Sequence, residues 1–112
     1  MSKLDEKIAA YMAEAKKLKL PLENSLIESV TKGLGPSIYK ADAETIASSD
    51  PEEIKRLKTN FLIKKLGLTD DAKLDTAIEE VFTQIGKSNR NKYRVLVYAM
   101  LVKKFKKESV YK

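Results

Sequence analysis

Apolar residues recur every three or four positions along most of the chain, with charged residues between them, and this is the pattern of amphipathic helices. The first such stretch carries Asp5 and Glu6 near its start, where acids complement the positive end of a helix. Ser2 is placed to cap it. The apolar side of this stretch consists of Leu4, Ile8, Tyr11, Ala15 and Leu18. We therefore expect a first helix that ends near Leu18.

Proline and glycine mark the limits of the second expected helix. Pro21 suits the first helical position, because its missing N–H would have no partner there in any case. Gly33 suits the residue that follows the last turn. The apolar positions between them are Leu22, Leu26, Ile27 and Val30. The sequence thus predicts a helix from Pro21 to Gly33.

Residues 33–49 form the least regular part of the chain. They contain two glycines and a Gly-Pro pair, which together indicate a turn. Pro36 is placed to begin a short helix that runs through Tyr39. A second short turn near residues 43–47 is an alternative that the sequence leaves open, so this segment holds one or two short helices.

The next helix has clear signals at both ends. Asp50 is a suitable N-cap, Pro51 fits the first helical position, and Glu53 completes the spacing of a capping box. The helix continues through residue 66. Gly67 then ends it, and Leu68 is placed to pack back on the last turn in a Schellman-type close.

A further helix follows after a short turn. Thr69 or Asp71 caps it, and Gly86 ends it. Three acids lie near its start, and its apolar residues form a wide stripe: Leu74, Ala77, Ile78, Val81, Phe82 and Ile85. This stripe predicts a helix with one face in the core.

Ser88 is placed to cap the last helix, which contains the run Val95–Val102, apolar on every side. The β-branched residues of this run also suit a strand. The segment from Ser88 onward holds no glycine or proline and is long for a strand, and no second strand candidate exists to pair with it. We therefore expect an all-α fold, a single-domain bundle of five or six helices over residues 1–112, with a central C-terminal helix.

Composition excludes several kinds of chemistry. The chain has no cysteine and no histidine, so it lacks thiolates, the usual general base near neutral pH and the commonest metal ligand. We expect no catalytic residue of the usual kinds, no metal and no cofactor. The longest apolar run is far shorter than the roughly 20 residues of a membrane helix. Because the first residues also lack the pattern of a secretory signal, we expect a cytoplasmic protein without a membrane span.

Charge is distributed unevenly. Residues 1–86 hold 13 Lys and Arg against 15 Asp and Glu, a net charge of −2, whereas residues 87–112 hold 9 against 1, a net charge of +8. The basic part opens with "GKSNRNKYR" at 86–94, where cations at the start of a helix oppose its macrodipole. Free N–H groups beside cations form an anion site. The candidates are Lys87, Ser88, Arg90, Asn91, Lys92 and Arg94.

An ion pair inside the protein explains the same cluster without a ligand. If Gly86 lies at the tip of a helical hairpin, Glu80 comes level with Arg94, and the two would lock the last helix against its predecessor. We prefer this pair to an external anion. The lysines near the chain's end suit the negative end of a helix and need no ligand either.

Two familiar motifs fail on inspection. "GKS" at 86–88 resembles the end of a phosphate-binding loop, but Val81 stands where that motif needs its first glycine. Residues 51–85 resemble a helix-turn-helix. The second of these helices, however, holds five acids against Lys73 alone, a net charge of −4, and DNA phosphates would repel it.

Four stretches of the sequence are similar to those of a known family: "GLGPSIYKADAET" at 33–45, "NFLIKKLGL" at 60–68, "GKSNRNKYR" at 86–94 and "KESVY" at 107–111. The chain resembles the domain of unknown function family 2853 over nearly its whole length. This resemblance implies a small stand-alone bacterial protein. It implies no activity, cofactor or site residue.

Three hypotheses about function follow. The leading one is a small non-enzymatic cytoplasmic binding or structural module. The second is an anion or nucleic-acid binder that uses residues 87–94 and the Lys-rich tail, with nucleic acid or an acidic protein as its partner. The third is an enzyme with a lysine or carboxylate site, although no residue is singled out for it.

Overall fold

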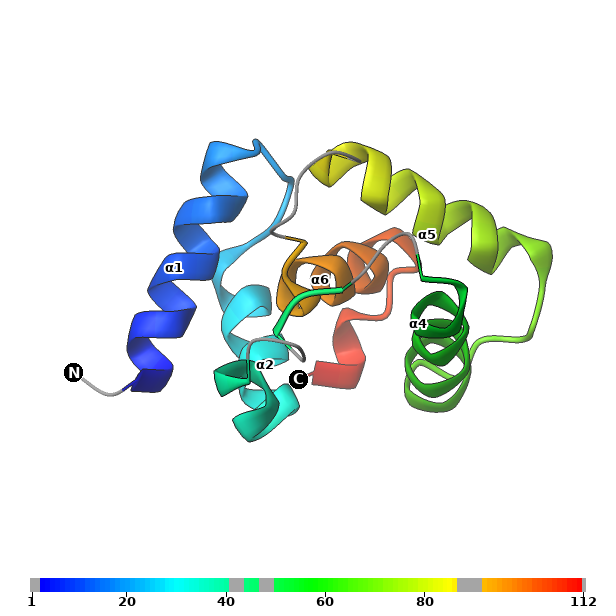
Figure 1. The fold of residues 1–112 in the computed structure, drawn as a ribbon, viewed down its shortest axis with the longest axis horizontal. Helices are drawn as coiled ribbons and strands as arrows, with labels where there is room; N and C mark the ends of the chain where they lie inside the picture. Colours follow the sequence, from blue (N-terminus) through cyan, green and yellow to red (C-terminus); the bar gives the residue numbers. More distant parts are fainter. Residues whose placement is uncertain (1–2, 41–43, 47–49, 87–91, 112) are drawn as a thin grey trace.

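A computed structural model describes residues 3–40, 44–46, 50–86 and 92–111 (Figure 1). The predicted all-α fold is confirmed in these ranges, where five α-helices form and the only β pairing is one isolated bridge. The α-helices are α1 (Lys3–Lys17), α2 (Asn24–Leu34), α4 (Pro51–Arg56), α5 (Ala72–Ile85) and α6 (Arg94–Lys104). The other helical segments are the 3-10 helices η1 (Gly35–Tyr39) and η3 (Glu108–Tyr111) and the π-helix η2 (Leu57–Lys65).

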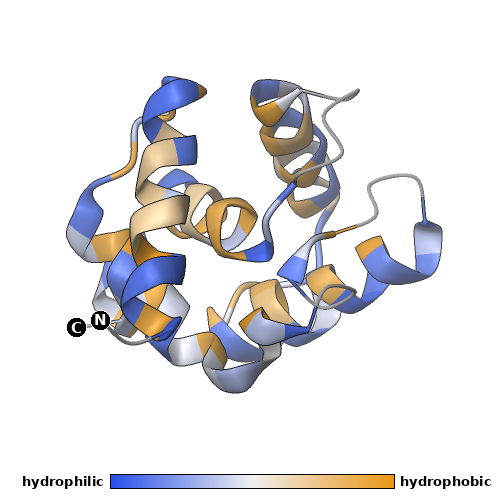
Figure 2. Ribbon diagram, turned by 60° about the vertical axis from the view of Figure 1, so that its left-hand side comes forward, coloured by the Kyte–Doolittle hydropathy of each residue, from blue (hydrophilic) through white to orange (hydrophobic). Residues whose placement is uncertain are grey.

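Helix α6 occupies the middle of the molecule, as the sequence predicts (Figure 1). It contacts α1, α2 and α5. Every residue of the run Val95–Val102 is buried except Tyr98, which is partly buried. Figure 2 shows hydrophobic and hydrophilic residues alternating along the ribbons of the other helices, as expected of helices with one face in the core. The core therefore forms around α6. None of the described helices combines the length and apolarity that a membrane crossing requires.

The boundaries of the second helix differ from the prediction. Pro21 precedes α2, which begins at Asn24, and Gly33 lies inside the helix. The residues around Pro21 are needed to reverse the chain, because Lys19 takes a left-handed φ of 58° and the N–H of Leu20 donates to the carbonyl of Ala15. At the other end, Gly35 with φ 65° stops the helix. The predicted short helix through Tyr39 follows as η1. Part of the 43–47 turn lies outside the described residues.

The helix after residue 50 begins as predicted and then widens. Asp50 accepts a hydrogen bond from the N–H of Glu52. Glu53, however, does not complete the capping box: its carboxylate accepts from Arg56 and Arg94. From Leu57 to Lys65 the helix is of the π type, and Gly67, with φ 72°, ends it. The N–H of Leu68 closes it by donating to Leu62, farther back than in an α-helical Schellman motif, because the turn is wider.

The last helix begins later than predicted. Ser88, its predicted cap, lies outside the described residues, and α6 begins at Arg94. Tyr93 is held instead in an antiparallel bridge to Thr45, and the N–H of Ile46 donates to the carbonyl of Lys92. This pairing keeps residues 92–93 extended and delays the helix. For α5, by contrast, the predicted cap is confirmed, since Asp71 accepts from the N–H of Lys73.

Candidate functional site

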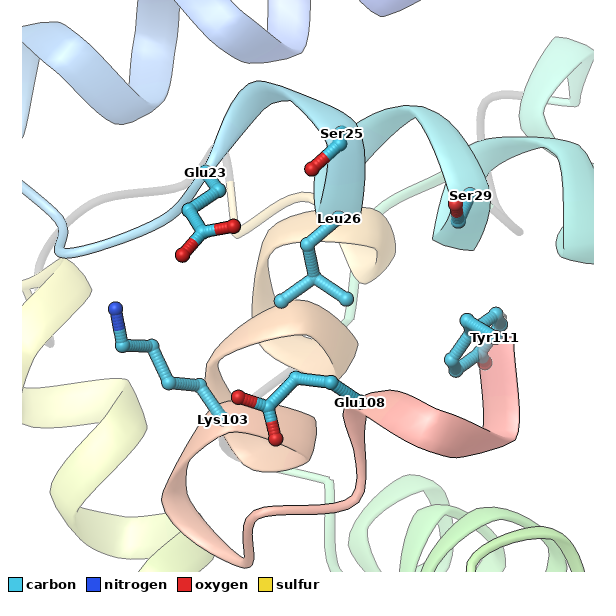
Figure 3. Close-up of a pocket in the computed structure, with 7 residues that line it drawn as sticks. All are labelled: Glu23, Ser25, Leu26, Ser29, Lys103, Glu108 and Tyr111. Carbon is cyan, nitrogen blue, oxygen red and sulfur yellow. The ribbon is translucent and has the colours of Figure 1, made fainter.

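A cleft with a volume of about 260 Å³ lies between the start of α2, the end of α6 and η3 (Figure 3). Leu26 contributes its apolar side chain to the cleft, and the other lining groups are polar. They are the carboxylates of Glu23 and Glu108, the ammonium of Lys103, the hydroxyls of Ser25 and Ser29, and the phenol of Tyr111. Six polar groups thus surround one small hollow that opens to solvent.

A reversal of the chain after α6 builds one wall of this cleft. Lys106 takes a left-handed φ of 56°, its N–H donates to Lys103, and the N–H of Lys107 donates to Val102. These two bonds form a Schellman motif, in which glycine is the usual left-handed residue. The motif turns the chain so that η3 packs on α2. In Figure 3, Tyr111 lies below Ser29 of α2, and the carboxylate of Glu108 is directed toward the side of the cleft where Lys103 lies.

The absence of a side chain at Gly33 lets Tyr111 approach α2 closely. A Cβ atom at Gly33 would lie 3.1 Å from Cε1 of the Tyr111 ring, which is tighter than ordinary van der Waals contact. On its other side the ring lies beneath Lys65, whose Nζ is 5.0 Å from the ring centroid, a cation–π contact. Tyr111 is thus held between α2 and η2.

Within the described ranges, the charged groups of the cleft have no charged partners. Among the described residues, no ion pair within 4.0 Å engages Glu23, Lys103 or Glu108. Glu23 is the N-cap residue of α2, but its side chain makes no capping hydrogen bond. Figure 3 shows Lys103 extending toward Glu23 along one side of the hollow. These three charges are therefore available to a ligand.

Tyr111 supplies a hydrogen-bond donor throughout the physiological pH range. Burial raises the pKa of its phenol to about 12, and the nearby phenol of Tyr98 acts in the same direction. The phenol therefore stays protonated at neutral pH. Together with the hydroxyls of Ser25 and Ser29, it can bind oxygen or nitrogen atoms of a ligand.

The structure places two of the six sequence-predicted anion-site residues. Lys92 is buried, with 3% of its surface exposed, and burial lowers its pKa. Arg94 is partly buried, and its guanidinium donates to Glu53 and to the hydroxyl of Tyr98. Lys87, Ser88, Arg90 and Asn91 lie outside the described residues. Both placed cations are turned into the protein.

The prediction that Arg94 pairs with Glu80 and locks the last helix against its predecessor is wrong, because Arg94 pairs with Glu53 of α4 instead. Glu80 pairs with Lys104 at 3.0 Å, and Arg94 pairs with Glu53 at 2.5 Å. The cause is the late start of α6. A hairpin tip at Gly86 would bring Arg94 level with Glu80, but the connection extends to Tyr93, so a residue farther along α6 reaches that level.

Sequence reasoning brought only Lys103 of the cleft into a functional hypothesis, as one of the lysines of the Lys-rich tail. The helix dipole also explains that lysine, and the serines of α2 stand out in no motif. One local signal was available at Glu23, since N-caps are usually Ser, Thr, Asp or Asn, whose short side chains reach the helix N–H groups. A glutamate at that position leaves its carboxylate for another use.

The cleft offers charged and hydrogen-bonding groups that can bind a ligand. In the described part of the chain, no group of three or more carboxylates is placed to hold a metal ion. Ser25 and Ser29 share the cleft with two carboxylates and one ammonium, and among the described residues neither hydroxyl is hydrogen-bonded to Lys103. The cleft thus contains charges of both signs together with hydroxyl groups that can donate or accept hydrogen bonds.

Comparison with known proteins gives a family and no activity. The family described as "Protein of unknown function (DUF2853)" matches residues 10–109, which include all the lining residues of the cleft except Tyr111. Among curated proteins, none matches the chain. An activity therefore has to be inferred from the geometry of the cleft.

Proposed function

The chain belongs to DUF2853, a family of unknown function, and we propose that it is a small non-enzymatic binding module whose α2–α6–η3 cleft holds a zwitterionic ligand of about the size of an amino acid. The observation that carries this proposal is the convergence of Glu23, Lys103 and Glu108, three charges without ion-pair partners among the described residues, on one hollow.

The signs of these charges define the ligand. Two carboxylates favour an ammonium group, and the single lysine favours a carboxylate. A simple cation would leave Lys103 unpaired, and a simple anion would face two carboxylates. A molecule with one ammonium and one carboxylate satisfies all three, while Ser25, Ser29 and Tyr111 add hydrogen bonds.

The size of the cleft limits the ligand further. A volume of about 260 Å³ is below the roughly 300–1,000 Å³ of pockets that hold drug-sized molecules. At about 30 Å³ for each water-sized group, it holds on the order of nine such groups. The ammonium, carboxylate and central carbon of an amino acid fit within this space.

A titration followed by NMR tests the proposal. We expect L-alanine to shift the backbone amide signals of Ser25, Leu26, Lys103 and Glu108 in a saturable manner. Lys103→Gln should weaken binding roughly 10–100-fold, because a hydrogen bond to a charged group contributes about 1.5–3 kcal/mol. The matched control is Lys32→Gln, an exposed lysine of α2 outside the cleft that is already paired with Glu28.

Two results would contradict the proposal. One is the absence of saturable shifts with L-alanine and with every other small zwitterion tried at millimolar concentration. The other is binding that Lys103→Gln leaves as tight as Lys32→Gln does. In either case the three charges of the cleft would have no role in recognition.

A further inference from the structure

A second cavity lies beside the cleft and shares Lys103 with it. Its volume is about 180 Å³, it is open to solvent on one side, and it is bordered by the segment before α2, by α5 and by the last turns of α6. Its lining residues are Pro21, Val81, Gln84, Met100, Lys103 and Lys104. Lys103 lines both hollows, so a ligand bound at Lys103 in the cleft lies next to the second one.

This second cavity is apolar where the cleft is polar. Its lining combines Pro21 with edges of the core residues Val81 and Met100, which are 1% and 6% exposed, and with the uncharged side chain of Gln84. Of the two charged residues in its lining, Lys104 is paired with Glu80, and Lys103 also borders the polar cleft. The cavity therefore offers carbon surface to a ligand held next to it.

We propose that the ligand is an α-amino acid with an aliphatic side chain, which lies across Lys103 and fills the second cavity. This inference rests on the proposed function. The ammonium of the ligand lies against Glu23 and Glu108, its carboxylate meets Lys103, and its side chain enters the space between Pro21, Val81 and Met100.

The volume of the second cavity agrees with this assignment. At about 30 Å³ for each water-sized group, 180 Å³ holds on the order of six groups. A leucine side chain has four carbons and leaves little space empty. Alanine places one methyl group at the mouth of the cavity and leaves it open to water. The cavity thus distinguishes amino acids by the apolar area that they bury.

A series of matched ligands tests the assignment by calorimetry or NMR. L-leucine should bind at least about tenfold more tightly than L-alanine, since each buried CH₂ group favours binding severalfold. Leucine amide lacks the carboxylate and 4-methylpentanoate lacks the ammonium, and each should bind at least about tenfold more weakly than leucine.

A variant that fills the second cavity tests whether the side chain of the ligand binds there. Gln84 is exposed on α5 and lines the second cavity, so Gln84→Trp should reduce the preference for leucine over alanine to nearly one. Thr83→Trp is the matched control, because Thr83 is exposed on the same helix and lines neither the cleft nor the second cavity. Gln84→Leu replaces Gln84→Trp if the larger residue prevents folding.

The outcomes separate this inference from the proposed function. Equal binding of leucine and alanine, or a leucine preference that Gln84→Trp and Gln84→Leu both leave intact, overturns the inference and leaves the proposed function standing. Leucine amide binding as tightly as leucine also overturns it, because the ligand would then be an amine or the N-terminus of a peptide. If no amino acid binds at all, the proposed function fails with it.

Discussion

The guanidinium of Arg94 lies 2.5 Å from the carboxylate of Glu53, although 41 residues separate them in the sequence. Their side chains are only 18% and 15% exposed. Arg94 is the first residue of the central helix α6, and Glu53 lies in the first turn of α4. Arg94 also donates to the hydroxyl of Tyr98, whose ring stacks on Phe61 of η2. One residue thus fixes the start of α6 to the segment 51–65.

Arg94→Ala should lower the free energy of unfolding by about 1.5–3 kcal/mol, because the largely buried carboxylate of Glu53 loses one of its two charged partners. Urea unfolding followed by circular dichroism measures this change. Lys104→Ala breaks the more exposed pair with Glu80 and should cost less than about 1 kcal/mol. Equal losses in the two variants would show that Arg94 contributes no more than a surface charge.

The Glu53–Arg94 pair should make the free energy of unfolding depend on pH. Burial raises the pKa of Glu53, but the hydrogen bonds from Arg56 and Arg94 outweigh it and hold this pKa below the ordinary value. The contribution of Glu53 is therefore complete above about pH 4.3, where a glutamate titrates in the unfolded chain, and is lost as the pH falls through the lower folded value. Unfolding curves of the parent and Glu53→Gln should differ at pH 7 and converge near pH 2. If the parent and Glu53→Gln still differ in stability at pH 2, the carboxylate of Glu53 does not make this contribution.

Leu101→Ala should destabilise the protein by about 2–5 kcal/mol, since Leu101 is fully buried in the central helix and its loss leaves a cavity among three other helices. Thermal and chemical unfolding measure the loss. Val110, 38% exposed on η3, is the control, and Val110→Ala should change stability by less than about 0.5 kcal/mol. Similar small losses in both variants would place α6 outside the core.

Lys106→Gly should stabilise the protein by roughly 0.5–1 kcal/mol, because a left-handed φ of 56° is strained for lysine and free for glycine. Lys107→Gly is the neighbouring control, since the φ of Lys107 is not positive, and it should destabilise slightly. Melting temperatures of the two variants test the prediction. If Lys106→Gly melts below the parent, the turn that builds the cleft wall does not have this geometry.

The burial of α6 was predictable because the run Val95–Val102 is apolar on all sides, so no rotation of the helix could leave it in water. Caps such as Asp50 and Asp71 were predictable because they act within one turn. The partner of Arg94 was not, since it depends on the length of the connection before α6. The bridge between Thr45 and Tyr93 sets that length, and it joins segments far apart in the sequence.

The cleft was unpredictable for the same reason. Its residues come from the start of α2 and from the chain beyond residue 102, and only the packing of η3 on α2 brings them together. No feature of the sequence predicts the π-helical geometry of residues 57–65 either. Leu57, Phe61 and Leu62 face the core there, at spacings that an α-helix would also give.

The position of α6 has a consequence for how the protein is made. Helices α1, α2 and α5 all pack on α6, yet they precede it in the chain. During synthesis, which adds roughly 5–20 residues each second, their apolar faces are complete before residues 94–104 exist to cover them. The nascent chain therefore passes through an interval with exposed hydrophobic surface. Ribosome-bound chains that stop before Arg94 should accordingly be sensitive to protease and bind chaperones, and chains that include α6 and η3 and extend clear of the ribosome should not.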